Sequence, residues 1–212
     1  MGEEKDMSSI QKITQITQNR FLNMYDLDVV HRTGKKGLYH VASRARSAAE
    51  LKLSTRVNKA DGVIIYALYG QARDRVVLIR QYRYSIADYI YEFPAGLVDE
   101  GEDFHEAGIR ELKEETGLTF HPLEVDPMYS RPYFTTIGMT DESCAAVYGT
   151  ADGRISREGL EDNEEIEVVL ADRTEIRRIL KEENVSLMCA YMMMHFLHSD
   201  PADPFAFLEV EA

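Results

Sequence analysis

Two glutamates, Glu111 and Glu115, carry the clearest chemical signal in the sequence. They stand four residues apart within residues 103–116, whose apolar spacing and terminal Gly117 predict a helix. At about 100° per residue, both carboxylates fall on the apolar stripe around Leu112, which should face the core. Like charges at this spacing repel, and burying them without a partner is costly. A divalent cation resolves both problems and favours Mg²⁺ or Mn²⁺; the competing interpretation is a solvated acidic helix face.

The residues around this pair follow a longer pattern. Gly96 is followed after five residues by Glu102, and seven further residues lead to Arg110 and Glu111. The pattern then continues through Leu112, Glu114, Glu115, Gly117 and Leu118. The complete segment, GLVDEGEDFHEAGIRELKEETGL, resembles the Nudix box at every defined position over 23 residues. A match of this length is far more specific than a lone glycine-rich loop.

The resemblance implies a fold and a set of metal ligands. The expected fold is α+β, the Nudix fold, with a mixed β-sheet in an α/β/α sandwich and the box forming a loop-helix-loop. Glu111 and Glu115 would be the main metal ligands and catalytic carboxylates, with Glu114 as a third candidate. The carbonyl of Ala95 would complete the shell of a bound metal ion.

Other positions of the box have implied structural roles. Arg110 would hold Glu102 and Glu114 in place through charge-assisted hydrogen bonds. Gly96 would allow a tight turn, and Gly117 would end the helix. Gly108 is unusual, because a glycine inside a helix costs about 1 kcal/mol relative to alanine; close packing and a nearby phosphate both remain open as explanations.

The segments beside the box narrow the resemblance to ADP-ribose and ADP-sugar pyrophosphatases. The run QYRY, ending at Tyr84, is followed by EFPAG, ending at Gly96. By similarity Arg83 would contact substrate phosphates; the alternative is a solvated arginine on an edge strand. Downstream, GMTDE resembles a substrate loop of the same group and implies that Glu142 positions substrate, although Ile137 stands where that loop usually has proline.

An acidic cluster, residues 162–168, resembles the start of a strand whose glutamate reaches into the site of the ADP-ribose group. Glu164 is the expected general base or last metal ligand, with Glu165 and Asp162 as alternates. A solvated acidic loop is the competing interpretation.

The implied reaction is the hydrolysis of a nucleoside diphosphate linked to another group, by attack of a metal-activated water on a phosphorus. The expected substrate is ADP-ribose, giving AMP and ribose 5-phosphate. ADP-glucose or GDP-mannose remains an alternative substrate. A non-catalytic Nudix module that senses a nucleotide is the alternative from another functional class.

The elements that must position these residues are predicted along the whole chain. Residues 1–57 should form a polar lead-in and a β-hairpin, 58–198 the hydrolase domain and 199–212 a tail. Hairpin strands are expected over residues 24–30 and 37–41. Later strands are expected over 61–69, 76–82, 89–93, 123–129, 142–148 and 165–170, and helices over 103–116, 174–183 and 185–198.

Composition limits the partners and the compartment. The net charge of −13 over 212 residues disfavours nucleic acid and anionic membranes as partners. Two cysteines and a polar N-terminus predict a cytoplasmic protein with free thiols. A lone hairpin is marginal in water, so we expect a homodimer packed through the hairpin. Phe21, Tyr25 and Arg56 are candidates to enter the partner's adenine pocket.

Overall fold

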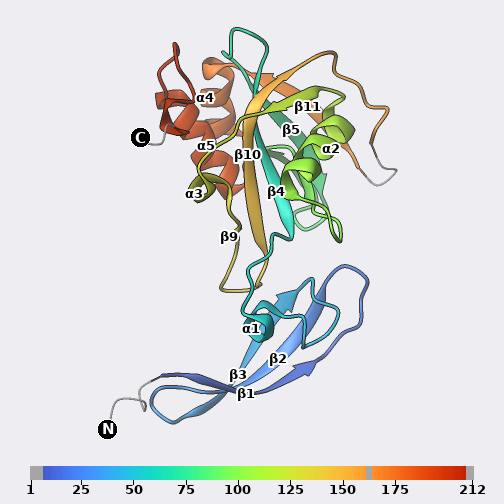
Figure 1. Cartoon of the computed structure of the whole chain (residues 1–212), viewed down its shortest axis with the longest axis vertical. Coiled ribbons are helices and arrows are strands. Elements are labelled where there is room, and N and C mark those ends of the chain that lie inside the picture. Colours follow the sequence, from blue (N-terminus) through green and yellow to red (C-terminus); the bar gives the residue numbers. More distant parts are fainter. Residues whose placement is uncertain (1–6, 161–163, 209–212) are drawn as a thin grey trace. The chain divides into compact units, whose positions relative to one another are not determined.

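The computed structural model describes residues 7–160 and 164–208 of the chain. The fold divides into two compact units. The first unit comprises Met1–Asp61 and Pro132–Cys144, and the second comprises Gly62–Arg131 and Ala145–Ala212 (Figure 1). The chain therefore returns to the first unit at residues 132–144. The domain boundaries expected at residues 57 and 198 stay a prediction.

The first unit is built on an antiparallel sheet in the order β1-β2-β3. Its strands are β1 (Ser9–Gln15), β2 (Asn23–Val30) and β3 (Lys36–Ser43), accompanied by α1 (Lys52–Thr55) and β9 (Tyr133–Phe134). The predicted hairpin is thus confirmed as β2 and β3. The predicted polar lead-in is wrong over β1, because this segment pairs along β2 and packs Ile13 against the core of the unit.

Buried and exposed side chains alternate along β2, so the sheet has one apolar face. Tyr25 and Leu27 are buried there with Val41 of β3 and Leu51. Tyr25 is fully buried, and its hydroxyl donates a hydrogen bond to the Ala45 carbonyl at 2.7 Å. The suggestion that Tyr25 reaches a partner's pocket is therefore wrong.

The second unit contains most of the larger sheet, whose central order is β11-β5-β4-β10-β8, with β6 beside β5 and β7 beside β4. The strands are β4 (Gly62–Tyr69), β5 (Val76–Arg83), β6 (Asp88–Glu92), β7 (Ala95–Leu97), β8 (Thr119–Pro122), β10 (Ser143–Asp152) and β11 (Ile166–Ala171). Its helices are α2 (Phe104–Thr116), α3 (Pro127–Ser130), α4 (Arg173–Glu182) and α5 (Leu187–His198). The α+β class with a sheet between helices is confirmed (Figure 1).

The two faces of β4 receive different partners because side chains alternate along a strand. Val63, Ile65 and Ala67 pack with Leu112 of α2 in one buried cluster. Tyr66, which lies between these positions, contacts aromatic rings of the opposite face, including Phe205 of the C-terminal segment. Figure 1 shows α2 on one side of the sheet and α4 and α5 on the other.

Two predicted segments differ from the structure. The strand expected over residues 123–129 is wrong: β8 ends at Pro122, and Asp126 caps α3 by accepting a hydrogen bond from the Met128 N–H, with Pro127 at the helix start. The expected tail contains the short helix η1 (Ala206–Leu208) and buries Phe205 and Leu208. Among the described residues, none of the helices combines the length and apolar character needed to cross a membrane.

Candidate active site

Helix α2 presents the two central glutamates. Asp103 caps its N-terminus by accepting a hydrogen bond from the His105 N–H at 2.9 Å, and Gly117 ends it in the left-handed region at φ 75°. Gly108 lies against the sheet, where an added Cβ would stand 2.6 Å from Cγ2 of Val147. Close packing on β10 therefore explains this glycine, and the helix axis is held near the strands.

Glu115 is a buried carboxylate with only 3% of its surface exposed. Its Oε2 accepts a hydrogen bond from the backbone N–H of Ala95 at 3.1 Å. Burial raises the pKa of Glu115 well above its ordinary value, and the negative charges of Glu111 and Glu164 act in the same direction. The structure thus places a costly charge on the core-facing side of α2.

Glu111 stands one turn earlier on the same helix and is also largely buried. Burial raises its pKa, while the hydrogen bond from Arg110 Nη1 to its Oε1, at 2.8 Å, opposes that shift. A Cβ on Gly96 would overlap the Glu111 carboxylate, and the φ of Gly96 is not positive. The expected tight turn is therefore not the reason for this glycine; space for the carboxylate is.

Arg110 connects three glutamates of the box. Its Nε and Nη2 donate to the two oxygens of Glu102, each at 3.0 Å, and its Nη1 donates to Glu114 at 3.0 Å. The same Nη2 donates to the Leu97 carbonyl. These bonds lower the pKa of Glu102. Arg110 makes the expected hydrogen bonds and additionally ties Glu111 to the network.

Among the three acidic candidates before β11, Glu164 lies in the electrostatic field of the buried pair, because its charge raises the pKa of both Glu111 and Glu115. Glu165 instead accepts a hydrogen bond from the Tyr89 hydroxyl. Asp162 lies outside the described residues. These charge interactions favour Glu164 over Glu165 for a role beside the helix, and that role stays a prediction.

Residues 156–159, in the loop that follows β10, are packed on α2. Gly159 fits so closely that an added Cβ would meet the backbone oxygen of Glu114 at 2.7 Å. Earlier in the same loop, the Ser156 N–H donates to the Thr116 carbonyl at 3.0 Å. Residues 156–159 therefore contact the C-terminal half of α2.

Arg83, at the end of β5, forms an ion pair with Glu92 at 2.7 Å. Its positive charge lowers the pKa of Glu115, so the guanidinium also acts on one carboxylate of the buried pair. Glu92 was not singled out from the sequence. The signal available was its position in the EFPAG run, opposite Ile79 in the pairing of β6 with β5.

Glu142 belongs to the first unit, whereas the box belongs to the second. Its Oε1 accepts hydrogen bonds from Arg44, with the closest nitrogen at 2.7 Å, and its Oε2 accepts one from the Thr135 hydroxyl at 3.2 Å. The described contacts of Glu142 therefore fix the loop of its own unit. Its expected contact with substrate stays a prediction.

The donor set suits a hard divalent cation. Within residues 7–160 and 164–208, no three acidic, imidazole or thiol side chains are arranged as a ready metal site. Glu111 and Glu115 instead bind Arg110 and the Ala95 N–H. Glu111 and Glu115 nevertheless offer the carboxylate oxygens that Mg²⁺ and Mn²⁺ prefer as ligands. Burial raises the pKa of both groups, and the negative charge of Glu164 raises it further.

Comparisons with known proteins agree with this arrangement. The family model described as "NUDIX domain" matches residues 58–189. "Putative nudix hydrolase 2" of Caenorhabditis elegans is 34% identical over 148 residues, which cover 67% of this chain and 62% of the relative. "ADP-ribose pyrophosphatase" of Saccharomyces cerevisiae is 32% identical over 108 residues, covering 50% and 47%.

A mouse relative and a solved structure add to these matches. "ADP-sugar pyrophosphatase" of Mus musculus is 36% identical over 87 residues, covering 40% of each chain. The chain thus spans between two fifths and about three fifths of these three curated relatives. A structure described as "Crystal structure of ADP compounds hydrolase" shares the fold, with a TM-score of 0.65 and 18% identity over 91% of this chain and 95% of that one. The box geometry, the family model and these relatives lead to one conclusion: the chain belongs to the Nudix family.

Proposed function

We propose that this protein is a Nudix pyrophosphatase that hydrolyses ADP-ribose to AMP and ribose 5-phosphate. The observation that carries the proposal is the buried pair Glu111 and Glu115: the charge of Glu164 raises the pKa of both carboxylates, and that of Arg83 lowers the pKa of Glu115. Relatives named as ADP-ribose and ADP-sugar pyrophosphatases support the substrate class. In a purely structural role, the two buried carboxylates would have only Arg110 and the Ala95 N–H as partners.

Glu111, Glu115 and Glu164 would hold Mg²⁺ or Mn²⁺, assisted by Glu114 and the Ala95 carbonyl. Bound divalent cations supply neutralisation of the pyrophosphate charge and a lower pKa for water at the site. Arg110 keeps the glutamates oriented through its bonds to Glu102, Glu111 and Glu114.

The remaining steps rest on side chains of the chain itself. Arg83 binds the phosphate oxygens of the substrate, exchanging its ion pair with Glu92 for the ligand. Glu164 accepts a proton from the attacking water. The oxygen of that water bonds to one phosphorus while the other phosphate departs with the electrons of the bridging P–O bond. Glu142 remains a candidate for positioning the substrate.

A panel of nucleoside diphosphate derivatives tests this assignment. Purified protein with Mg²⁺ would be given ADP-ribose, ADP-glucose and GDP-mannose, with phosphate read after a coupled phosphatase. We expect the highest kcat/KM for ADP-ribose and products AMP and ribose 5-phosphate by chromatography. Faster turnover of another sugar nucleotide would reassign the substrate. No turnover of any compound, together with saturable nucleotide binding, would favour a sensing module.

The first unit supplies the surface for a proposed homodimer. On the apolar face of its sheet, Ile10 stands opposite Val29, beyond the buried residues Tyr25 and Leu27. Ile10 is 45% exposed and Tyr39, on the same face, is 42% exposed. The apolar face therefore continues past its core, and a second copy of the chain would cover it.

A cytoplasmic location completes the proposal. Cys144 and Cys189 are both free. Burial raises the pKa of the Cys144 thiol to about 11, and it also raises that of Cys189. Unpaired, protonated thiols suit a reducing compartment.

A further inference from the structure

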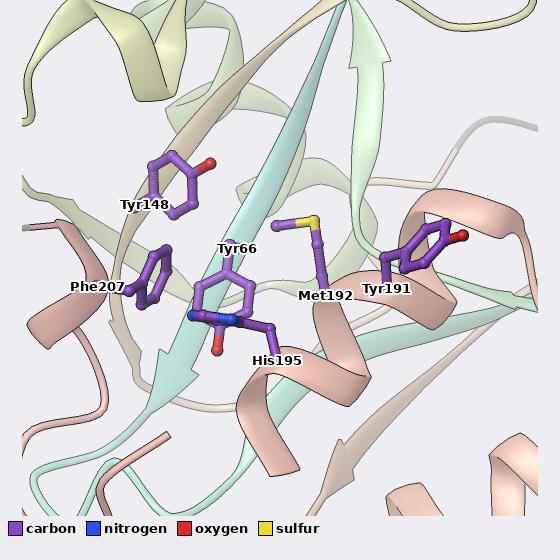
Figure 2. A pocket seen from close by; sticks show the side chains of 6 residues that line it. All are labelled: Tyr66, Tyr148, Tyr191, Met192, His195 and Phe207. Atoms are coloured by element: carbon purple, nitrogen blue, oxygen red, sulfur yellow. The ribbon is translucent and has the colours of Figure 1, made fainter. Parts of the chain in front are cut away.

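The sheet face opposite α2 has an apolar part and a polar part. Beside α5, Tyr66 of β4 lines one cavity with Met192 and His195 (Figure 2), and its buried hydroxyl has no hydrogen-bond partner among the described residues. Farther along β5, the same face carries polar and aromatic side chains that are not buried: Arg80, Tyr82, Tyr89, Glu165 and Glu167. Two of the strands that carry them, β5 and β11, also lead to Arg83 and Glu164 of the proposed hydrolase site.

Glu164 and Glu165 belong to opposite faces of the sheet, because side chains alternate along a strand. Val168 of β11 packs against the buried cluster beneath α2, so Glu164, four residues earlier, belongs to the α2 side and Glu165 to the other. The Tyr82 N–H donates a hydrogen bond to the Glu165 carbonyl at 3.1 Å, which continues the pairing of β5 with β11 by one residue. A displacement of Glu165 would therefore also move Glu164.

The side chain of Glu165 is held from another strand. The Tyr89 hydroxyl, from β6, reaches across β5 and donates a hydrogen bond to Oε1 of Glu165. The Arg80 guanidinium lies 4.0 Å from the centroid of the Tyr89 ring, and the Tyr82 ring packs edge-on against it at 5.5 Å. The Tyr89 carbonyl accepts a hydrogen bond from Nδ2 of Asn184 at 3.2 Å. These contacts fix the phenol group that holds Glu165.

The place of Glu164 in the chain makes such an anchor useful. The regular pairing of β11 with β5 starts at Ile166, so Glu164 stands just before the strand. Strand ends open more readily than strand interiors. A general base, however, must stay within hydrogen-bond reach of the water that it deprotonates. A hydrogen bond to the side chain of Glu165 limits the movement of the backbone at this end of β11.

We propose that Tyr89 is a positioning residue for the hydrolysis: by holding Glu165 on one face of the sheet, it fixes the backbone that carries Glu164 on the α2 side. The inference rests on the proposed function, in which Glu164 accepts a proton from the attacking water. Tyr89 and Glu165 face away from α2, so they act on the reaction through Glu164 and not through contact with the substrate.

Variants that remove or keep this hydrogen bond test the proposal. Tyr89→Phe and Glu165→Ala each remove it, whereas Glu165→Gln keeps an oxygen that can accept it. With ADP-ribose and saturating Mg²⁺, we expect kcat to fall about 3- to 10-fold in the first two variants, as the loss of one hydrogen bond implies, with KM unchanged. Glu165→Gln should recover most of the kcat that Glu165→Ala loses. Combining Tyr89→Phe with Glu165→Ala should lower kcat no further, because both remove the same contact.

Hydrogen exchange of backbone amides, followed by NMR without substrate, measures the anchoring itself. The Tyr82 N–H is bonded to the Glu165 carbonyl, so its exchange should become faster in Tyr89→Phe and Glu165→Ala and stay unchanged in Glu165→Gln. The Ile65 N–H, which donates to the Pro94 carbonyl at 2.9 Å, is the control for the rest of the sheet. Its exchange should be the same in all variants.

The outcomes separate this inference from the proposed function. If the unmodified protein hydrolyses ADP-ribose, an unchanged kcat in Tyr89→Phe would overturn the positioning role. An equal loss of kcat in Glu165→Gln and Glu165→Ala would also overturn it, because the carboxylate charge of Glu165 would then be needed directly. Faster exchange at Ile65 would reduce Tyr89 to a general structural role. No turnover by the unmodified protein would instead refute the proposed function, and the positioning role with it.

Discussion

The Oε2 of Glu115 lies 3.1 Å from the backbone nitrogen of Ala95, so the helix of the Nudix box is tied to strand β7 through a buried carboxylate. A single neutral N–H donor does little to offset the burial of a full charge. Glu111, one turn earlier, is partly exposed but still mostly buried, and it shares Arg110 with two other glutamates. The site therefore has excess negative charge that a divalent cation would balance.

Activity should depend on divalent metal. We expect excess EDTA to abolish hydrolysis of ADP-ribose, and added Mg²⁺ or Mn²⁺ to restore it, because the carboxylates of Glu111 and Glu115 supply hard oxygen ligands. The rate should also rise toward alkaline pH, where water is more easily deprotonated. Steady-state assays at fixed ionic strength measure both effects. Unchanged hydrolysis after complete chelation would refute the metal assignment.

Glu115→Gln should lower turnover by at least about 100-fold, as the loss of a main metal ligand implies. The amide oxygen of glutamine can still accept the Ala95 N–H, so the fold should persist. Glu106→Gln is the matched control, because it makes the same change at an exposed position of the same helix. Near-normal turnover in Glu115→Gln, measured with saturating Mg²⁺, would contradict the assignment.

The same variant tests the buried charge without metal. The folded pKa of Glu115 is raised above the ordinary value of 4.5, so the folded state holds its proton more tightly than the unfolded state. Stability in EDTA should therefore fall as the pH rises from about 4.5 through the raised pKa. Glu115→Gln should be more stable than the unmodified protein at pH 8 and similar at pH 4, in urea titrations.

The sequence predicted much of the fold because periodic apolar residues dominate its central elements. Strands β4 and β5 and helix α2 match their predictions, since their β-branched runs and capping residues agree locally with the fold. Strand β1 escaped prediction because its residues are mostly polar and the strand is defined by pairing with β2. A mostly polar strand that is held by backbone pairing leaves little apolar pattern in the sequence.

The part of the candidate site that lies in the box could be predicted, because the spacing of its residues identifies them. The pattern of the box located Glu111, Glu115 and the hydrogen bonds of Arg110. The reason for Gly96 was missed, because the approach of the Glu111 carboxylate depends on how α2 packs beside β7. The unpaired hydroxyl of Tyr66 could not be predicted either. A buried strand has the same apolar sequence pattern whether or not its tyrosine hydroxyl has a hydrogen-bond partner.

Gly108→Ala should destabilise the protein although alanine is the better helix former. Alanine gains about 1 kcal/mol in a helix interior, but its Cβ would stand 2.6 Å from Cγ2 of Val147, and overpacking costs typically about 1–3 kcal/mol. The same change should become stabilising in a Val147→Ala background, where the conflict is removed. A double-mutant cycle by urea unfolding measures this coupling; a stabilised single variant would disprove close packing as the cause.

Asp103 should contribute to stability in a pH-dependent way. Its hydrogen bond from the His105 N–H lowers its pKa below the ordinary 3.8, so the ionised cap stabilises the fold above that pH, and this stabilisation is lost as the pH falls through the lowered pKa. We expect Asp103→Ala to lose about 1 kcal/mol at pH 7. Asp103→Asn keeps the cap without the charge, so its deficit should shrink toward pH 3. A deficit of Asp103→Asn that is constant with pH would exclude the charge as the cause.

Ile10→Lys should weaken the proposed homodimer. Ile10 lies on the uncovered end of the apolar face, opposite Val29, and a lysine there would place a charge in the interface. Leu38→Lys is the matched control: Leu38 is 54% exposed on the same sheet, but it pairs with Asp28 and therefore faces the other side. Sedimentation velocity over a concentration series should give a larger dissociation constant for Ile10→Lys and no change for Leu38→Lys. A monomer of 24.2 kDa at micromolar concentration in the unmodified protein would rule out the dimer, and equal effects of the two variants would place its interface elsewhere.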